Sequence, residues 1–290
     1  MNKSFTILLY LLLLSAPALS QEDHGTAKEA VSVSAPDGSK ADSKRISPIP
    51  EGCKPEVPHF IHTTWGQDAP YSNETPTDST GTHCCTGCVV TSLAQIMNYY
   101  RYPDKLVDGT EIDWASMRDS YSGEYSEAEG RAVALLMARC GKAVKMNYGV
   151  KVSLTYPKET ADGVVREFGY IVKDYGYKDY PNNPNYDDAK WKEVVYRELS
   201  AGRPVLYGGT SYKHGPDDYF SHSFILDGYD REGRVHVNYG LNGNGNGYYD
   251  LDRLPLKCDG IDEEFDTYQT LVVIHRPEDG PIEYDLEPLK

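Results

Sequence analysis

The chain has 290 residues, a formal net charge of −15 and 39% apolar residues. This length and apolar content suit one large globular domain. The excess of Asp and Glu over Lys and Arg would repel a phosphate backbone, and the sequence has no basic stripe with interleaved aromatic residues. We therefore expect no nucleic-acid partner.

The N-terminal residues predict export. A short basic start at residues 1–3 precedes an apolar run at 5–14 and the small-residue sequence Ala16-Pro17-Ala18-Leu19-Ser20, which is the order of a cleavable secretory signal. We expect residues 1–20 to be a signal peptide, with a signal anchor as the alternative. The apolar run is shorter than the roughly 20 residues of a membrane helix, so no membrane span is expected in the mature protein. The pattern is compatible with three final locations: release from the cell, the periplasm or the cell surface.

Residues 21–50 are predicted to be a flexible linker. They are rich in Ser, Ala, Asp, Glu, Lys and Pro, and they hold too few large apolar groups to offset the entropy of ordering. The segment is also shorter than the roughly 40 residues that fold alone without staples, so we expect no folded prodomain in it. The folded domain is expected over residues 51–290.

The first half of that domain is predicted to be helical. One helix begins near Cys88 and ends before Pro103, because apolar residues recur at helical spacing between them. Cys140 continues the apolar face of a second helix and is interpreted as a buried core thiol. The further amphipathic helices are expected at 126–139, 159–168 and 187–201.

The second half is predicted to be strand-rich. Short β-rich runs separated by Gly, Asp and Asn turns occur at 204–207, 221–226, 234–238, 247–251 and 270–274. This pattern favours a twisted antiparallel sheet. Helices segregated from an antiparallel sheet define an α+β fold, here with an expected cleft between the two halves.

Cys88 is the candidate nucleophile because it stands where a helix begins, after the small residues Thr86 and Gly87. A helix N-terminus carries partial positive charge and unpaired N–H groups, which favour the thiolate and lower the pKa of a cysteine. His222 and Asn238 stand far downstream in strand-like sequence. The cleft between the halves would bring His222 against Cys88.

Four blocks of sequence occur in an order that is typical of one enzyme family. They are Trp65-Gly66-Gln67 with Pro70-Tyr71, Thr86-Gly87-Cys88 continuing through Ala94-Gln95-Ile96-Met97 to Tyr102-Pro103, His222 with Asp227-Gly228-Tyr229, and His236-Val237-Asn238 before a Gly-rich loop and Leu251-Asp252. On these blocks the chain resembles the streptopain family of papain-like cysteine peptidases from about residue 58 to 274. The resemblance implies a papain-like two-part fold with the active site in the cleft.

The resemblance also implies a set of catalytic roles. Cys88 corresponds to the nucleophile, His222 to the general base and acid, Gln67 to an oxyanion-hole donor and Asn238 to the residue that orients the imidazole. The implied activity is that of an exported bacterial cysteine endopeptidase that hydrolyses peptide bonds through a thioester acyl-enzyme. Its expected partners are protein or peptide substrates, with a separate inhibitor as a further candidate, and a monomeric state without cofactor or metal is expected.

The sequence departs from the family pattern beside the expected site. Tyr239 and Leu241 stand where family members tend to have tryptophans, and we expect Tyr239 to shield a histidine–asparagine hydrogen bond less completely. Ser221 replaces the usual Gly before the histidine, and Asp217-Asp218 lengthens the preceding loop. Substrate preference therefore stays open. The 24 tyrosines are interpreted either as lining a peptide groove or as covering sheet surfaces.

The run Cys84-Cys85-Thr86-Gly87-Cys88 allows other interpretations. In an oxidising compartment a Cys85–Cys88 disulfide would block catalysis until it is reduced. The same C-x-x-C pair could serve a thiol–disulfide oxidoreductase, although the expected βαβ setting is absent. A zinc site with His83 is weaker, since adjacent cysteines crowd one metal. A catalytically inactive binding module with this fold is a third class, and the pairing of Cys53, Cys84, Cys85 and Cys258 stays open.

Overall fold

A computed structural model describes residues 49–178 and 186–286. The predicted signal peptide and residues 21–48 of the predicted linker lie outside these ranges. Within them the helices are α1 (Cys88–Tyr100), η1 (Trp114–Ser116), α2 (Glu127–Ala143), α3 (Pro157–Phe168), α4 (Asp188–Ser200) and η2 (Pro277–Asp279). None of the described helices is both long and apolar enough to cross a bilayer.

The four α-helices form where helical periodicity predicted them, and local signals set their ends. A capping box begins α2, in which the side chains of Ser126 and Glu129 bond each other's backbone N–H groups. Proline at the first position begins α3, and Gly169 at φ 73° ends it in the left-handed conformation. Cys140 is completely buried in the core, as predicted.

Six strands form one antiparallel sheet in the order β1-β8-β2-β3-β4-β5, and β6 and β7 form a separate hairpin. The strands are β1 (Ile171–Tyr177), β2 (Val205–Ser211), β3 (Phe220–Tyr229), β4 (Val235–Asn238), β5 (Gly247–Tyr249), β6 (Pro255–Cys258), β7 (Ile261–Glu264) and β8 (Thr267–His275). Helices in the first half and an antiparallel sheet in the second confirm the predicted α+β fold.

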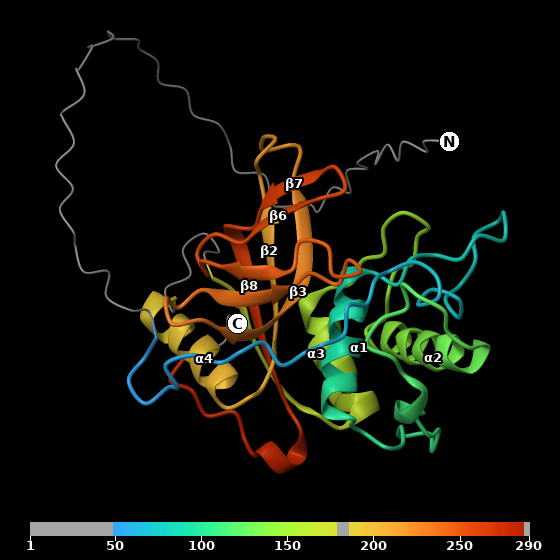
Figure 1. The fold of residues 1–290 in the computed structure, drawn as a ribbon, viewed down its shortest axis with the longest axis horizontal. Helices are drawn as coiled ribbons and strands as arrows, with labels where there is room; N and C mark the ends of the chain where they lie inside the picture. Colours follow the sequence, from blue (N-terminus) through green and yellow to red (C-terminus); the bar gives the residue numbers. More distant parts are fainter. Residues whose placement is uncertain (1–48, 179–185, 287–290) are drawn as a thin grey trace, which may run out of the picture. The chain divides into compact units, whose positions relative to one another are not determined.

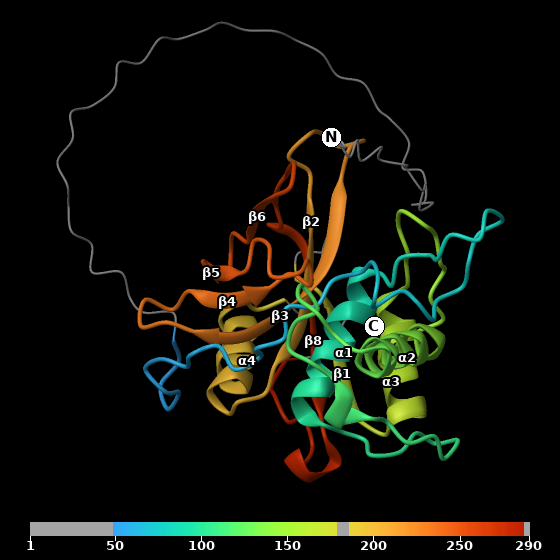
Figure 2. The ribbon, with the colours of Figure 1, turned by 45° about the vertical axis from the view of Figure 1, so that its right-hand side comes forward.

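Both faces of the sheet are covered by helices. Successive side chains of a strand point to opposite faces, so Leu206, Ile225 and Val272 pack in the core that α1, α2 and α3 share, while Val205 and Phe224 pack in the core beside α4. In Figure 1 and Figure 2, α1, α2 and α3 stand together on one side of the strands, and α4 stands on the other. Cys88 and Val89, at the N-terminal end of α1, lie beside residues of the two middle strands, β2 and β3.

Three strands were not expected from the sequence pattern. β1 pairs with β8 at the edge of the sheet, and all but one of its residues are only partly buried, so its alternation is weak. β6 and β7 are joined by Asp259-Gly260, and both residues have positive φ. A two-residue turn of this kind is a sequence signal for a hairpin.

Candidate active site

Cys88 is the first residue of α1, and its place depends on a glycine. The preceding Gly87 has φ 86°, in the left-handed region that favours glycine. A Cβ on Gly87 would lie 3.0 Å from the carbonyl oxygen of Ser153 and 3.1 Å from Cε of Met146. The chain therefore turns into the helix at a position with no room for a side chain, and the turn leaves Cys88 partly exposed.

His222 lies in β3 among aromatic side chains. Its Nε2 hydrogen-bonds to the carbonyl oxygen of Tyr239 at 2.8 Å, which leaves Nδ1 for the thiol. The imidazole stacks with the rings of Phe265 and Tyr239, at centroid distances of 5.9 and 6.2 Å. The Tyr239 side chain is completely buried, and its hydroxyl donates to the carbonyl of Pro255. These rings cover the imidazole and its hydrogen bond to the backbone.

Cys88 and His222 form a hydrogen-bonded pair with opposite pKa shifts. Burial opposes ionisation of the thiol, but the hydrogen bond and charge of His222 and the N–H groups of Ser223 and Val89 hold the pKa of Cys88 below its usual value. Burial also opposes protonation of the imidazole, but the bonds to Cys88 and to the Tyr239 carbonyl raise the pKa of His222. The two shifts favour a thiolate–imidazolium pair.

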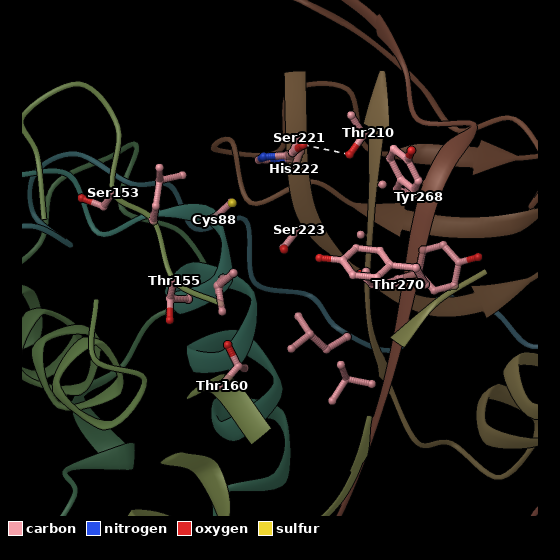
Figure 3. A pocket seen from close by; sticks show the side chains of 18 residues that line it. Cys88, Ser153, Thr155, Thr160, Thr210, Ser221, His222, Ser223, Tyr268 and Thr270 are labelled. Atoms are coloured by element: carbon pink, nitrogen blue, oxygen red, sulfur yellow. Dashed lines mark hydrogen bonds between the residues drawn. The ribbon is translucent and has the colours of Figure 1, made fainter. Parts of the chain in front are cut away.

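A groove with a volume of about 170 Å³ opens beside this pair. Figure 3 shows Cys88 pointing across it towards His222, with Ser153 and Thr155 on the helical side and Tyr268 and Thr270 on the sheet side. Gly208 and Gly209 of β2 also line it, and Gly209 pairs with His222 across the strands. Tyr177, Tyr207 and Tyr268 line the groove, and all three belong to strands of the sheet.

Gln67 lies beside the approach to Cys88. Its carbonyl oxygen accepts a 3.0 Å hydrogen bond from the N–H of Thr86, two residues before the nucleophile. A Cβ on the neighbouring Gly66 would lie 2.4 Å from Oδ1 of Asn242, so the Gly-rich loop after β4 packs directly on this segment. The structure thus brings the Gln67 backbone to the start of α1. Its side chain is partly buried.

The predicted contact between Asn238 and the imidazole is wrong. Asn238 donates through Nδ2 to the carbonyl oxygen of Thr63 at 2.8 Å and to Oε1 of Gln95 at 3.2 Å. Nε2 of His222 instead bonds to the backbone carbonyl of the next residue, Tyr239. The Asn238 side chain therefore bonds to Thr63 and Gln95, and the residue reaches His222 only through its neighbour Tyr239. A backbone carbonyl leaves no trace in residue identity, so the sequence offered no signal for it.

Cys85 does not have the properties of an attacking thiol. It is buried, its thiol donates to the carbonyl oxygen of Gly149 at 3.4 Å, and burial raises its pKa. Cys85 and Cys88 are both free thiols in this structure. In the part of the chain that the structure describes, no three His, Cys, Asp or Glu side chains are arranged to hold a metal ion. The oxidoreductase and zinc alternatives gain no support from this geometry.

The chain is similar to known proteins in sequence and in structure. The model of the Peptidase C10 family matches residues 65–249. Streptopain of Streptococcus pyogenes is 31% identical over 227 residues, which cover 68% of this chain and 54% of streptopain, so the chain spans about half the length of that relative. The thiol protease/hemagglutinin PrtT of Porphyromonas gingivalis is 27% identical over 209 residues, 66% of this chain and 23% of PrtT.

Two solved structures share the fold. Active wild-type interpain A cysteine protease of Prevotella intermedia matches with a TM-score of 0.67 and 36% identity, covering 78% of this chain and 98% of that chain. A fragment of prointerpain A from the same organism matches with a TM-score of 0.63 and 34% identity, covering 78% of this chain and 74% of the fragment.

Proposed function

The chain belongs to the Peptidase C10 family, and from this membership and the site geometry we propose that it is a cysteine endopeptidase of protein or peptide substrates. The observation that carries the proposal is the hydrogen-bonded pair of Cys88 and His222, with opposite pKa shifts, at the wall of a groove. A thiolate at a helix N-terminus beside an imidazolium is the arrangement that nucleophilic acyl transfer requires.

In the proposed reaction the Cys88 thiolate attacks the scissile carbonyl. The imidazolium of His222 gives its proton to the leaving amine, which departs and leaves a thioester on Cys88. Neutral His222 then takes a proton from water as the water attacks the thioester, and the thiolate returns. The Tyr239 carbonyl contributes by keeping a proton on Nε2, so that Nδ1 is the nitrogen that exchanges protons with the reacting groups.

Each tetrahedral intermediate carries an oxyanion that needs donors. The backbone N–H at the start of α1 is one candidate, because the first N–H groups of a helix have no partner within the helix. The side-chain amide of Gln67 is the second, since its backbone is bonded to Thr86 beside this helix end. Removing one such donor typically lowers kcat by about 10² to 10³.

Cleavage of casein by the purified protein tests the proposal. We expect wild-type protein to cleave casein, and Cys88→Ala to lose cleavage while its near-UV circular dichroism stays unchanged. Cys140→Ala removes a buried thiol elsewhere and is expected to keep activity. Activity that survives in Cys88→Ala contradicts the mechanism, and a folded wild-type protein that cleaves no protein or peptide would favour an inactive binding module.

The proposed enzyme acts outside the cytoplasm. The support is the secretory-signal pattern of residues 1–20. N-terminal sequencing of protein produced in a bacterial host and recovered outside the cytoplasm should give a chain that begins at Gln21. An uncleaved chain that stays in the membrane fraction would instead identify a signal anchor.

Control of Cys88 by a disulfide with Cys85 stays a prediction. Its support is the C-x-x-C spacing together with the proposed oxidising location. Mass spectrometry of unreduced protein should find the two cysteines joined, and dithiothreitol should then raise activity. Cys85→Ser would be active without reductant. A free Cys88 under air, with activity indifferent to dithiothreitol, removes the hypothesis.

A further inference from the structure

The long polar side chain of Gln95 is completely buried in helix α1. Gln95 follows Cys88 by seven residues, about two helical turns, so the two side chains lie on the same face of the helix. Its Oε1 accepts hydrogen bonds from the hydroxyl of Thr63 at 2.9 Å, the N–H of Trp65 at 3.3 Å and Nδ2 of Asn238 at 3.2 Å. Three segments distant in sequence therefore meet at one oxygen.

The orientation of this amide is determined by its neighbours. The Trp65 N–H can only donate, so the Gln95 atom that faces it must be the oxygen. Asn238 is fixed in the same way, because its Nδ2 donates to the carbonyl of Thr63 and its Oδ1 accepts from the N–H of Gly240 at 3.1 Å. Among the described residues, Nε2 of Gln95 has no hydrogen-bond partner. A buried donor without a partner destabilises a fold, so Gln95 contributes as an acceptor.

The segments that meet at Gln95 are the ones that carry the catalytic groups. Trp65 lies two residues before Gln67, and Asn238 lies directly before Tyr239, whose carbonyl holds His222. One turn nearer the thiol, the Thr91 hydroxyl donates to the carbonyl of Gly66 at 3.2 Å. The same helix face thus binds the Gln67 segment at two successive points.

We propose that Gln95 is a positioning residue. Its side-chain oxygen fixes the positions of the Gln67 segment and of the Asn238–Tyr239 strand end relative to the helix that carries Cys88. This inference rests on the proposed peptidase function. It assigns no contact between Gln95 and substrate. Loss of the oxygen leaves the Trp65 N–H without its acceptor and Asn238 with the Thr63 carbonyl alone, so the imidazole and the oxyanion donor both lose alignment with the thiol.

Variants of Gln95 separate this role from a purely structural one. Gln95→Met keeps the length of the side chain and removes the acceptor, whereas Gln95→Glu keeps an oxygen at the same point. Asn98→Leu is the matched control, since Asn98 is a buried amide of the same helix whose Oδ1 has no partner among the described residues. Each full-length variant is assayed for kcat and KM on a fluorogenic peptide, for thermal unfolding, and for the pH dependence of iodoacetamide alkylation at Cys88, located by mass spectrometry.

We expect Gln95→Met to lower kcat by about tenfold or more with KM changed by less than about threefold. Its alkylation profile should move to higher pH by about one unit, because a misaligned imidazole stabilises the thiolate less. Gln95→Glu should keep kcat within about threefold of wild type and leave the pH profile of alkylation unshifted. Asn98→Leu should lose thermal stability but keep the wild-type kcat and alkylation profile. If Gln95→Met does not fold, Thr63→Val removes one of the three donors and should give a smaller shift in the same direction.

An alkylation profile and a kcat in Gln95→Met that match those of Asn98→Leu would overturn the proposal, since the amide would then serve folding alone. Failure of the peptidase function itself is distinguishable. In that case wild-type protein cleaves nothing, while alkylation of Cys88, which needs no turnover, still reports whether Gln95 sets the state of the thiol.

Discussion

At the residue scale, the site depends on how one imidazole is held. His222 is 6% exposed, and one of its nitrogens is committed to the Tyr239 carbonyl at 2.8 Å. Since that nitrogen keeps its proton at all times, the second nitrogen alone gains and loses a proton. An amide side chain could have served as this partner, but a backbone carbonyl cannot be removed by a single substitution. The sequence indicated His222 itself and not the group that orients it.

The pKa shifts of the pair predict the pH range of activity. The thiolate is present above the pKa of Cys88, which lies below the usual 9.0, and the imidazolium is present below the pKa of His222, which lies above the usual 6.5. Activity should therefore rise as the thiol ionises, at a pH below 9.0, and fall as the imidazolium loses its proton, at a pH above 6.5. Measurement of kcat/KM against pH gives this range directly.

Replacement of His222 should raise the pKa of the Cys88 thiol. Without the imidazole, burial is left opposed only by backbone N–H groups, so the pKa of Cys88 rises in His222→Ala. The rate of iodoacetamide alkylation at pH 7 should fall by about tenfold or more, because only the thiolate reacts. His62→Ala changes an exposed histidine and serves as the control. An unchanged rate in His222→Ala would show that the helix N-terminus alone ionises Cys88.

At the element scale, the long amphipathic helices and the central strands were predictable because one or both faces are buried. α1 shows this clearly, since ten of its residues are buried and Pro103 follows closely. The edge strand β1 and the hairpin of β6 and β7 carry a weaker hydrophobic pattern. The groove walls could not be predicted either, because they arise where strands and a loop from the helical half meet in space.

A glycine in β2 shows how the sheet shapes the groove. A Cβ on Gly208 would lie 2.7 Å from Oγ1 of Thr270 and 3.1 Å from the carbonyl oxygen of His222. In Gly208→Ala the new methyl group and the Thr270 side chain cannot both keep their places at the groove wall, so we expect KM for a peptide to rise by about tenfold with kcat changed less. Gly123→Ala is the control, since nothing lies near that position. Unchanged KM in Gly208→Ala would mean that substrate does not contact this wall.

At the scale of the whole molecule, one buried carboxylate joins three parts of the chain. Glu198 of α4 is completely buried and accepts from Nε and Nη2 of Arg203 at 2.8 and 2.9 Å. It also bonds Nε2 of His275 in β8 at 2.9 Å and the hydroxyl of Tyr284 in the C-terminal segment. The pairing of α4 with the sheet and with the C-terminal segment therefore depends on a charge that is fully enclosed by donors.

Glu198→Gln should destabilise the folded protein strongly. Burial opposes ionisation of Glu198, but His275, Arg203 and Tyr284 together hold its pKa below the usual 4.5. A depressed folded-state pKa contributes stability above the unfolded value, which is lost as pH falls from 4.5 through the folded value. Breaking a buried charge network typically costs about 3–5 kcal/mol, since the remaining charge loses its partner.

Urea unfolding at several pH values tests this expectation. Glu198→Gln should lower the free energy of unfolding at pH 7 by about 3–5 kcal/mol, and the difference from wild type should shrink as the pH falls below about 4.5. Glu193→Gln breaks an exposed ion pair of the same helix with Arg197, which should change stability by less than about 1 kcal/mol. A constant difference across the pH range would show that Glu198 stabilises the fold through packing, because a charge that titrates cannot contribute equally on both sides of its pKa.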